Sequence, residues 1–154
     1  MTRFRKPAIL ALAVLLLLSC FPAWAETAES AEQTLIRLVN EDRARYGLNA
    51  LTVDPALCSV ARIKAQDMLS GGYFAHTSPT YGDIRKMLTT FGVSYTYASE
   101  NIARSRDVTH AQAQFLSSST GHRQTLLGSQ WTRMGVGVAI TAQGFVYVSQ
   151  IFAR

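Results

Sequence analysis

The sequence predicts an α+β domain, because helical patterns fill the first part of the chain and strand patterns fill its end. Residues 134–141 and 145–152 are rich in β-branched and aromatic residues. The segment between them, residues 141–144 (TAQG), has the composition of a hairpin turn. A chain of 154 residues without an internal repeat suits one domain.

The first helix is predicted from a cap and an apolar face. Ser30 followed by Gln33 has the spacing of a capping box. This places a short lead at residues 26–33 and the folded domain at residues 34–154. Apolar residues then recur at helical spacing until Gly47, where we expect the helix to end.

The second helix has the clearest signals. Asp54 can accept hydrogen bonds from unpaired N–H groups, and Pro55 suits the first helical position. Gly71 and Gly72 stop the pattern. Its apolar positions recur at helical spacing: Leu57, Val60, Ala61, Ala65, Met68 and Leu69.

The middle of the chain predicts shorter elements. Residues 83–91 have the pattern of a third helix, and residues 93–102 alternate weakly, as a strand would. Thr109 and Gln112 have capping-box spacing and predict the start of a fourth helix. Residues 122–127 predict one more helical turn.

Residues 1–25 are predicted to be a signal peptide. A basic start precedes an unbroken apolar run at residues 8–18, which is too short to span a bilayer. Residues 23–25 (AWA) then match the small-x-small cleavage pattern. Export to the periplasm or the extracellular space follows. An alternative is lipoprotein anchoring through Cys20, which we favour less because the Ala-Trp-Ala site follows at once.

Charge and cysteine content exclude some classes. From residue 26 onward, 12 basic residues face 10 acidic ones, and the basic residues are scattered in pairs. This argues against nucleic-acid binding, which favours a dense basic stripe. Cys58 is then the only cysteine outside the leader, so we expect no internal disulfide and interpret Cys58 as a small buried hydrophobe.

Three ionisable residues are candidates for a site: His76, Glu100 and His122. Two imidazoles and one carboxylate would suit a zinc ion completed by water, with His76 and His122 as ligands. They would equally suit acid–base catalysis. More than 20 residues separate each from the next, so only the fold can bring them together. His110, at a predicted helix start, is assigned no role.

Other interpretations of neighbouring residues stay open at this stage. Glu100 could instead accept backbone N–H bonds that fix its loop, and Asn101 could bond local backbone. Ser78 and Ser119 lie near the histidines, but neither lies in a Gly-x-Ser-x-Gly elbow, so we favour turn and capping roles. Four tyrosines lie near these motifs and could face a ligand or the core: Tyr73, Tyr81, Tyr95 and Tyr97.

An ordered set of short motifs resembles the bacterial, SCP-like extracellular branch of the CAP superfamily, which also holds cysteine-rich secretory, antigen 5 and pathogenesis-related 1 proteins. No single tetrapeptide is specific, but the order is, and it covers nearly all of residues 35–152. The matching elements are Leu38-Val39-Asn40 with Arg43, Gly47-Leu48, Leu57 with Ala61 and Ala65, residues 74–79 (FAHTSP), Gly92-Val93, residues 100–103 (ENIA), Gly121-His122-Arg123 with Leu126-Leu127, residues 135–138 (GVGV) and residues 150–152 (QIF).

The resemblance implies a three-layer α-β-α sandwich with a central antiparallel sheet. It implies that His76, Glu100 and His122 line one cleft, where the family usually has two histidines and two acidic residues and can hold Zn²⁺. The second acidic residue should lie in the helix before His122, which contains no Asp or Glu after Asp107, and Phe115 replaces the usual tryptophan. The loss weakens any two-carboxylate mechanism and removes a charge that would help hold a cation.

Three functions follow as hypotheses. The first is an exported binding module whose cleft takes a ligand; the resemblance suggests a lipid or sterol, a cell-wall glycan or another protein. The second is a metal-assisted hydrolase, of peptidase type, using His76, Glu100 and His122. The third is a structural factor of the cell envelope. The sequence favours binding over catalysis and predicts no organic cofactor.

Overall fold

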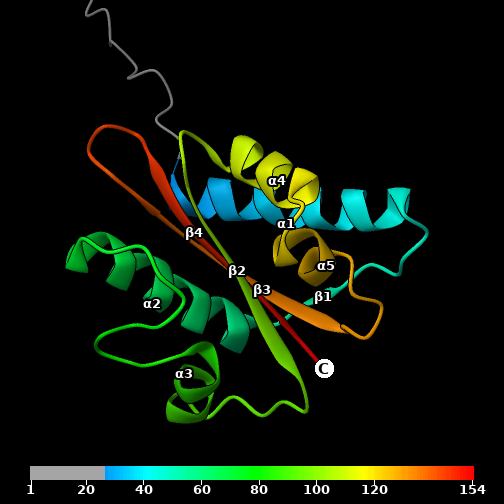
Figure 1. Cartoon of the computed structure of the whole chain (residues 1–154), viewed down its shortest axis with the longest axis horizontal. Coiled ribbons are helices and arrows are strands. Elements are labelled where there is room, and N and C mark those ends of the chain that lie inside the picture. The colour runs from blue at the N-terminus through cyan, green and yellow to red at the C-terminus, as the bar shows by residue number, and fades with distance from the viewer. Residues whose placement is uncertain (1–26) are drawn as a thin grey trace, which may run out of the picture.

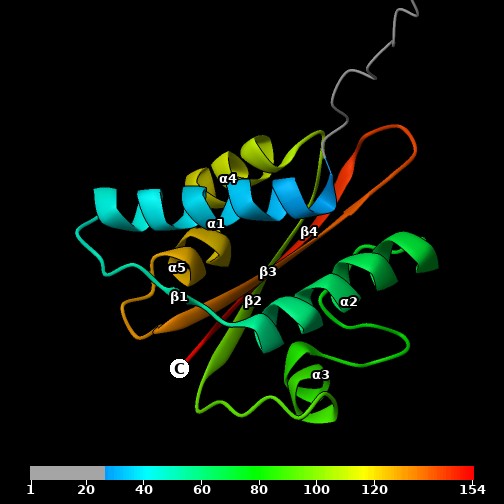
Figure 2. The same ribbon diagram turned by 180° about the vertical axis from the view of Figure 1, so that it is seen from behind.

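The computed structural model describes residues 27–154, and the predicted signal peptide and Cys20 lie outside this range. One sheet lies between two helical layers, with α1, α4 and α5 on one face and α2 and α3 on the other (Figures 1 and 2). The predicted α-β-α sandwich is therefore confirmed. The elements are α1 (Ala28–Arg45), β1 (Thr52–Val53), α2 (Pro55–Gly71), α3 (Ile84–Thr90), β2 (Ala98–Ser105), α4 (Val108–Ser117), α5 (Gly121–Leu126), β3 (Arg133–Ile140) and β4 (Val146–Ala153).

The sheet has the strand order β1-β3-β4-β2, so β2 is an edge strand. The β3–β4 hairpin and the β2–β4 pair are antiparallel, as expected. The short β1 pairs with β3 in parallel, and the sequence patterns did not predict this strand. This pairing arises because the amide of Asp54, the residue that caps α2, donates to the carbonyl of Met134 at 2.8 Å.

Alternate side chains of the strands fill the cores on the two faces of the sheet. On one face, Val148 and Phe152 of β4 pack with buried residues of α1, α4 and α5. On the other, Ile151 and Ala153 pack with buried residues of α2 and α3. Strand β4 is buried along its whole length, because both of its faces are covered.

Two glycines let α2 lie directly on β3. A Cβ added at Gly135 would lie 2.2 Å from the carbonyl carbon of Leu57. One added at Gly137 would lie 2.2 Å from the carbonyl carbon of Ala61 and from the amide nitrogen of Arg62. The backbone of α2 therefore occupies the space that side chains would take, which is the close approach that glycines in a strand permit.

Two of the predicted helix starts are wrong. Helix α1 is capped by Thr27, whose side chain accepts from the amide of Ser30, so Ser30 is the third helical residue and not the cap. Residues 28–33 are consequently helical. Helix α4 is capped by Asp107, which accepts from the amide of His110 at 2.6 Å, and not by Thr109. In both cases a suitable oxygen acceptor lies two or three residues earlier than the predicted box.

The predicted cap of α2 is confirmed. Asp54 accepts from the amides of Ala56 and Leu57, Pro55 is the first helical residue, and Gly72 ends the helix in the left-handed region, with φ of 64°. Strand β2 begins at Ala98, later than the predicted residue 93, because its pairing with β4 starts at Ala98 opposite Ala153.

Among residues 27–154, no helix has the length and apolar character needed to cross a bilayer. Cys58 is buried in α2, as predicted, and burial raises the pKa of its thiol.

Candidate functional site

The structure brings His76 and Glu100 into direct contact. The Nδ1 atom of His76 lies 3.0 Å from Oε2 of Glu100. The Glu100 side chain is only 2% exposed, whereas that of His76 is 56% exposed. The hydroxyl of Ser149, on β4, donates to the other Glu100 oxygen at 3.0 Å. Glu100 thus bonds two side chains, and the backbone role considered from the sequence is not what the structure shows.

His122 reaches the same region from the other layer. It is the second residue of α5, and the side-chain amide of Asn101 donates to its backbone carbonyl at 3.1 Å. Asn101 therefore bonds backbone 21 residues away in sequence, and not the local backbone that was predicted. The Ser118 hydroxyl lies 3.4 Å from Nδ1 of His122, and the Phe115 ring packs edge-on against the imidazole with centroids 5.4 Å apart.

The two histidines are close enough to influence each other. Burial lowers the pKa of His122, and the charge of His76 lowers it further. Such an approach is possible because β2 is an edge strand, so groups from the two helical layers can meet around it. Within the described residues, His76 and Glu100 thus form a hydrogen-bonded pair, and His122 is linked to His76 by this charge effect and not by a hydrogen bond.

His76, Glu100 and His122 do not form a three-ligand metal site in the described part of the chain. Within residues 27–154, no group of three or more His, Cys, Asp or Glu residues is arranged to hold a metal ion. In α4, the buried polar residue is Gln112, which donates to Asp42 at 2.7 Å and accepts from Gln150 at 2.7 Å. The side-chain amide of Gln112 thus links α4 to α1 and β4 by hydrogen bonds. An acidic residue at this position would add a negative charge, and Gln112 does not.

A buried polar network that the sequence analysis missed holds the His76 loop. Lys64 of α2 is 0% exposed, and its ammonium donates to the carbonyls of Ala75 at 2.7 Å and His76 at 2.9 Å. Burial lowers the pKa of Lys64, while the charges of Glu100 and Asp67 raise it. Lys64 therefore fixes the backbone at His76 from inside the protein.

Asp67 completes this network one helical turn later. Its carboxylate accepts from the Tyr73 hydroxyl and from the Ser78 hydroxyl, the latter at 2.7 Å. Ser78 also accepts from the amides of Thr80 and Tyr81, so it is a turn residue, as favoured from the sequence. The missed signal was the position of Lys64, which lies at helical spacing from Leu57 and Met68 within the apolar face of α2.

The remaining candidates are peripheral. Ser119 is exposed, and the residue at the N-cap of α5 is Thr120, which makes no side-chain capping bond, so the capping role expected for Ser119 is not found. Tyr73 is half-buried within the Asp67 network, and Tyr81 and Tyr95 pack against the core beside α3. Tyr97 is exposed.

The α-β-α fold, with the His76–Glu100 pair and His122 near its edge strand β2, defines a class of domain that comparison with known proteins identifies. The model of the cysteine-rich secretory protein (CAP) family matches residues 36–152. The chain belongs to this family, as the resemblance predicted.

The chain is similar to several bacterial proteins. It is 36% identical over 123 residues to the uncharacterized protein YkwD of Bacillus subtilis, covering 80% of this chain and 47% of YkwD. A crystal structure of an extracellular protein containing an SCP domain from Bacillus anthracis shares 34% identity and a TM-score of 0.76, covering 82% of this chain and 41% of that one. An outer surface protein of Borrelia burgdorferi has the same fold, with 18% identity, a TM-score of 0.76, and coverage of 84% and 96%. The chain thus spans less than half the length of the two Bacillus proteins.

Proposed function

We propose that the chain is an exported ligand-binding module in which His76 and His122 together take a divalent cation, Zn²⁺ by the chemistry of the donors. The ligand classes are those that the family suggests: a lipid or sterol, a cell-wall glycan or a protein. Support for export comes from the sequence pattern of residues 1–25 and from the extracellular SCP-domain protein of Bacillus anthracis.

The observation that carries the proposal is the arrangement of the imidazole nitrogens. Nδ1 of His76 contacts Glu100, and Nδ1 of His122 faces Ser118. In metal sites, the second ring nitrogen of a histidine usually donates to a carboxylate or another oxygen, which directs the first nitrogen to the metal. This arrangement leaves both Nε2 atoms for a cation, with solvent or a ligand supplying the other positions.

The position of Glu100 favours binding over hydrolysis. A general base needs a free oxygen near the substrate, but Oε2 of Glu100 contacts His76 and Oε1 accepts from Ser149. The hydroxyl of Ser78 donates to Asp67 and is not directed at either histidine. We therefore assign Glu100 to orienting His76, and the hydrolase hypothesis ranks second.

A calorimetric titration with Zn²⁺ tests the proposal. We expect one Zn²⁺ per chain in the wild-type protein, loss of about tenfold or more in affinity in His76→Asn and in His122→Asn, and no measurable binding in the double variant. His110→Asn is the matched control, because His110 lies at the start of α4 and contacts neither histidine in the hydrogen-bond network. An unchanged affinity in either single variant would overturn the two-histidine site.

A second measurement separates binding from catalysis. Peptide and ester substrates are offered to the zinc-loaded protein, with Glu100→Gln as the comparison. The binding function predicts no turnover in either form. Turnover by the wild type that Glu100→Gln abolishes would favour the hydrolase instead.

A further inference from the structure

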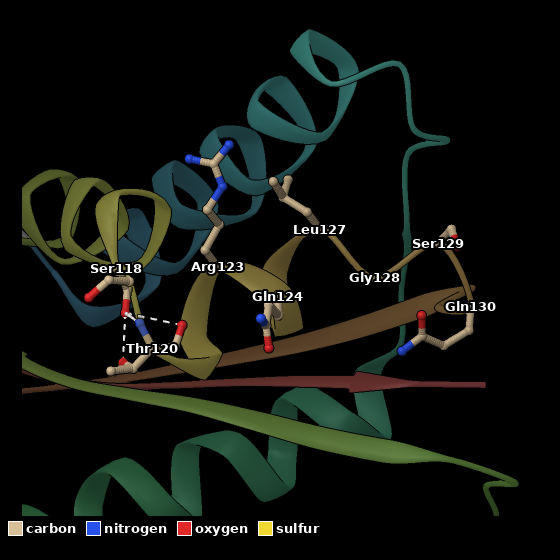
Figure 3. A pocket seen from close by; sticks show the side chains of 9 residues that line it. Ser118, Thr120, Arg123, Gln124, Leu127, Gly128, Ser129 and Gln130 are labelled. Carbon is tan, nitrogen blue, oxygen red and sulfur yellow. Dashed lines mark hydrogen bonds between the residues drawn. The ribbon is translucent and has the colours of Figure 1, made fainter.

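A polar pocket of about 650 Å³ opens beside α5, away from the Glu100 side of the sheet. Its volume falls within the usual range for small-molecule sites, roughly 300–1,000 Å³. The lining side chains come from the segment before α5, from α5 itself and from the loop that follows (Figure 3). Ser118 lies between this pocket and the candidate cation site, because its hydroxyl contacts both the Thr120 hydroxyl and Nδ1 of His122.

The backbone of this pocket is held from inside the protein. Arg43 of α1 is only 1% exposed, and its Nη1 donates to the carbonyls of Leu126 and Gly128, each at 2.9 Å. The indole N–H of Trp131 donates to the carbonyl of Thr125 at 2.7 Å. Burial of a guanidinium costs free energy and lowers the pKa of Arg43, so holding this backbone from inside is energetically unfavourable by itself. The result is a pocket wall that is fixed before any ligand arrives.

By contrast, several polar side chains that line the pocket have no hydrogen-bond partner within the described chain. Within the described chain, no hydrogen bond involves the side chains of Ser119, Gln124, Ser129 or Gln130, whereas most polar groups of the inner frame are paired. Hydroxyl and amide groups both donate and accept, which is what the hydroxyls of a sugar require. The side-chain amide of Gln130 lies over Gly128. Its oxygen and nitrogen are both within 3 Å of the position that a Cβ on Gly128 would take.

Charge narrows the ligand class further. Arg123 is the only ionisable residue in the lining, which contains no acidic side chain. Its guanidinium lies over the ring of Tyr46, with 5.0 Å between the guanidinium carbon and the ring centroid. Its Nη1 also donates to the carbonyl of Leu116 at 3.5 Å, so the stacked guanidinium keeps its remaining N–H groups for a carboxylate.

We propose that this pocket binds an oligosaccharide that carries a carboxylate, with Arg123 contacting the carboxylate and Gln124, Ser129 and Gln130 contacting sugar hydroxyls. The proposal goes beyond the cation site and does not depend on it. The rigid frame from Arg43 and Trp131 distinguishes this pocket from an ordinary surface hollow, because it presents free polar side chains on a fixed backbone.

Titration of the labelled protein, followed by backbone amide NMR shifts, tests the proposal. The probes are a tetragalacturonate, a hyaluronan tetrasaccharide and neutral chitotetraose. We expect at least one of the two acidic probes to shift amides within residues 118–130, with chitotetraose about tenfold weaker or more. Neither acidic probe shifting these amides at about 10 mM, a concentration that detects even binding weaker than 1 mM, would overturn the proposal.

Variants make the test specific. Arg123→Gln should remove the preference for acidic probes, and Gln130→Ala should weaken binding about tenfold by removing a hydrogen-bonding side chain. Arg106→Gln is the matched control, because Arg106 is also exposed but does not line this pocket. Equal loss in Arg106→Gln would show general charge attraction and contradict the assignment. His76→Asn should leave glycan binding intact while reducing Zn²⁺ binding, so that the two proposals can fail separately.

Discussion

The two faces of the sheet are built in different ways, and each supplies one of the two histidines. On the α2 face, the helix backbone lies directly on β3 through Gly135 and Gly137. On the α1, α4 and α5 face, large side chains such as Met134 and Phe152 separate helices from strands. The first arrangement is set by backbone contact and the second by side-chain volume.

The two faces also differ in how they hold their histidine. The loop of His76 follows α2 and is fixed by charged groups, namely the ammonium of Lys64 and the carboxylate of Asp67. Helix α5, which holds His122, is fixed by Asn101 and Arg43, whose side chains donate to backbone carbonyls. The candidate site therefore depends on two separate sets of buried polar side chains. A substitution in one set should leave the backbone held by the other set in place.

The largest loss of stability is expected from a substitution at Gly137 on the α2 face. In Gly137→Ala, the added methyl group would meet the backbone of Ala61 and Arg62, which can move only if α2 moves as a unit. We expect the free energy of unfolding to fall by more than about 4 kcal/mol, in the range of severe core disruption. Urea denaturation measures it.

Val136→Ala is the matched control for the other face. It removes two buried methyl groups beside Gly137, and should cost about 1.5–3 kcal/mol. If adding one methyl group at position 137 costs less than removing two at position 136, the distinction between backbone contact and side-chain packing is wrong.

A smaller effect is expected when Lys64 is replaced. Lys64→Met keeps the apolar stem but leaves the carbonyls of Ala75 and His76 without their donor and leaves Asp67 without a nearby cation. We expect a loss of about 3 kcal/mol. Hydrogen exchange should accelerate at residues 73–82 but not at residues 121–128. Lys86→Met, at an exposed position, should change neither; equal exchange in both segments would show that the two sets are one.

The smallest expected change is in the free energy of unfolding at alkaline pH. Burial, together with the hydrogen bond to Asp67, raises the pKa of Tyr73 from 10.0 to about 12. Between these values the unfolded chain has lost the phenol proton and the folded chain keeps it, so the free energy of unfolding should fall as pH rises. Denaturation midpoints from pH 9 upward should show this slope in the wild type. Tyr73→Phe should lack it, whereas a variant at exposed Tyr97 should retain it; a slope that persists in Tyr73→Phe would assign the effect to another group.

Much of the fold could be predicted from local signals. Asp54, Pro55 and Gly72 define α2 because capping and the left-handed glycine act on neighbouring backbone. The starts of α1 and α4 were misplaced because several residues in a row could cap, and the choice between Thr27 and Ser30 depends on geometry. Strand β1 escaped prediction because its two residues are strand only by pairing with β3, far along the chain.

The contact between His76 and Glu100 could be expected from the sequence, but the residues that support it could not. His76, Glu100 and His122 were candidates by residue type, and only the resemblance implied that they lie together, because their spacing carries no proximity. Lys64 was missed because a lysine in a helical stripe is normally a surface residue, and only the tertiary fold shows that its ammonium reaches two carbonyls. Ser149 was missed for a similar reason, since only the β2–β4 register places it beside Glu100.

In the proposed cation site, each helical layer presents one imidazole Nε2 while a protein oxygen faces the corresponding Nδ1. Long-range nitrogen–proton NMR spectra of the histidine rings, recorded before and after one equivalent of Zn²⁺, identify the nitrogens that bind the cation. We expect Nδ1 of His76 to carry its proton before Zn²⁺ is added, and Nε2 of His76 and of His122 then to shift together. A shift confined to one of these two histidines, or zinc binding through Nδ1 of His76, would contradict it.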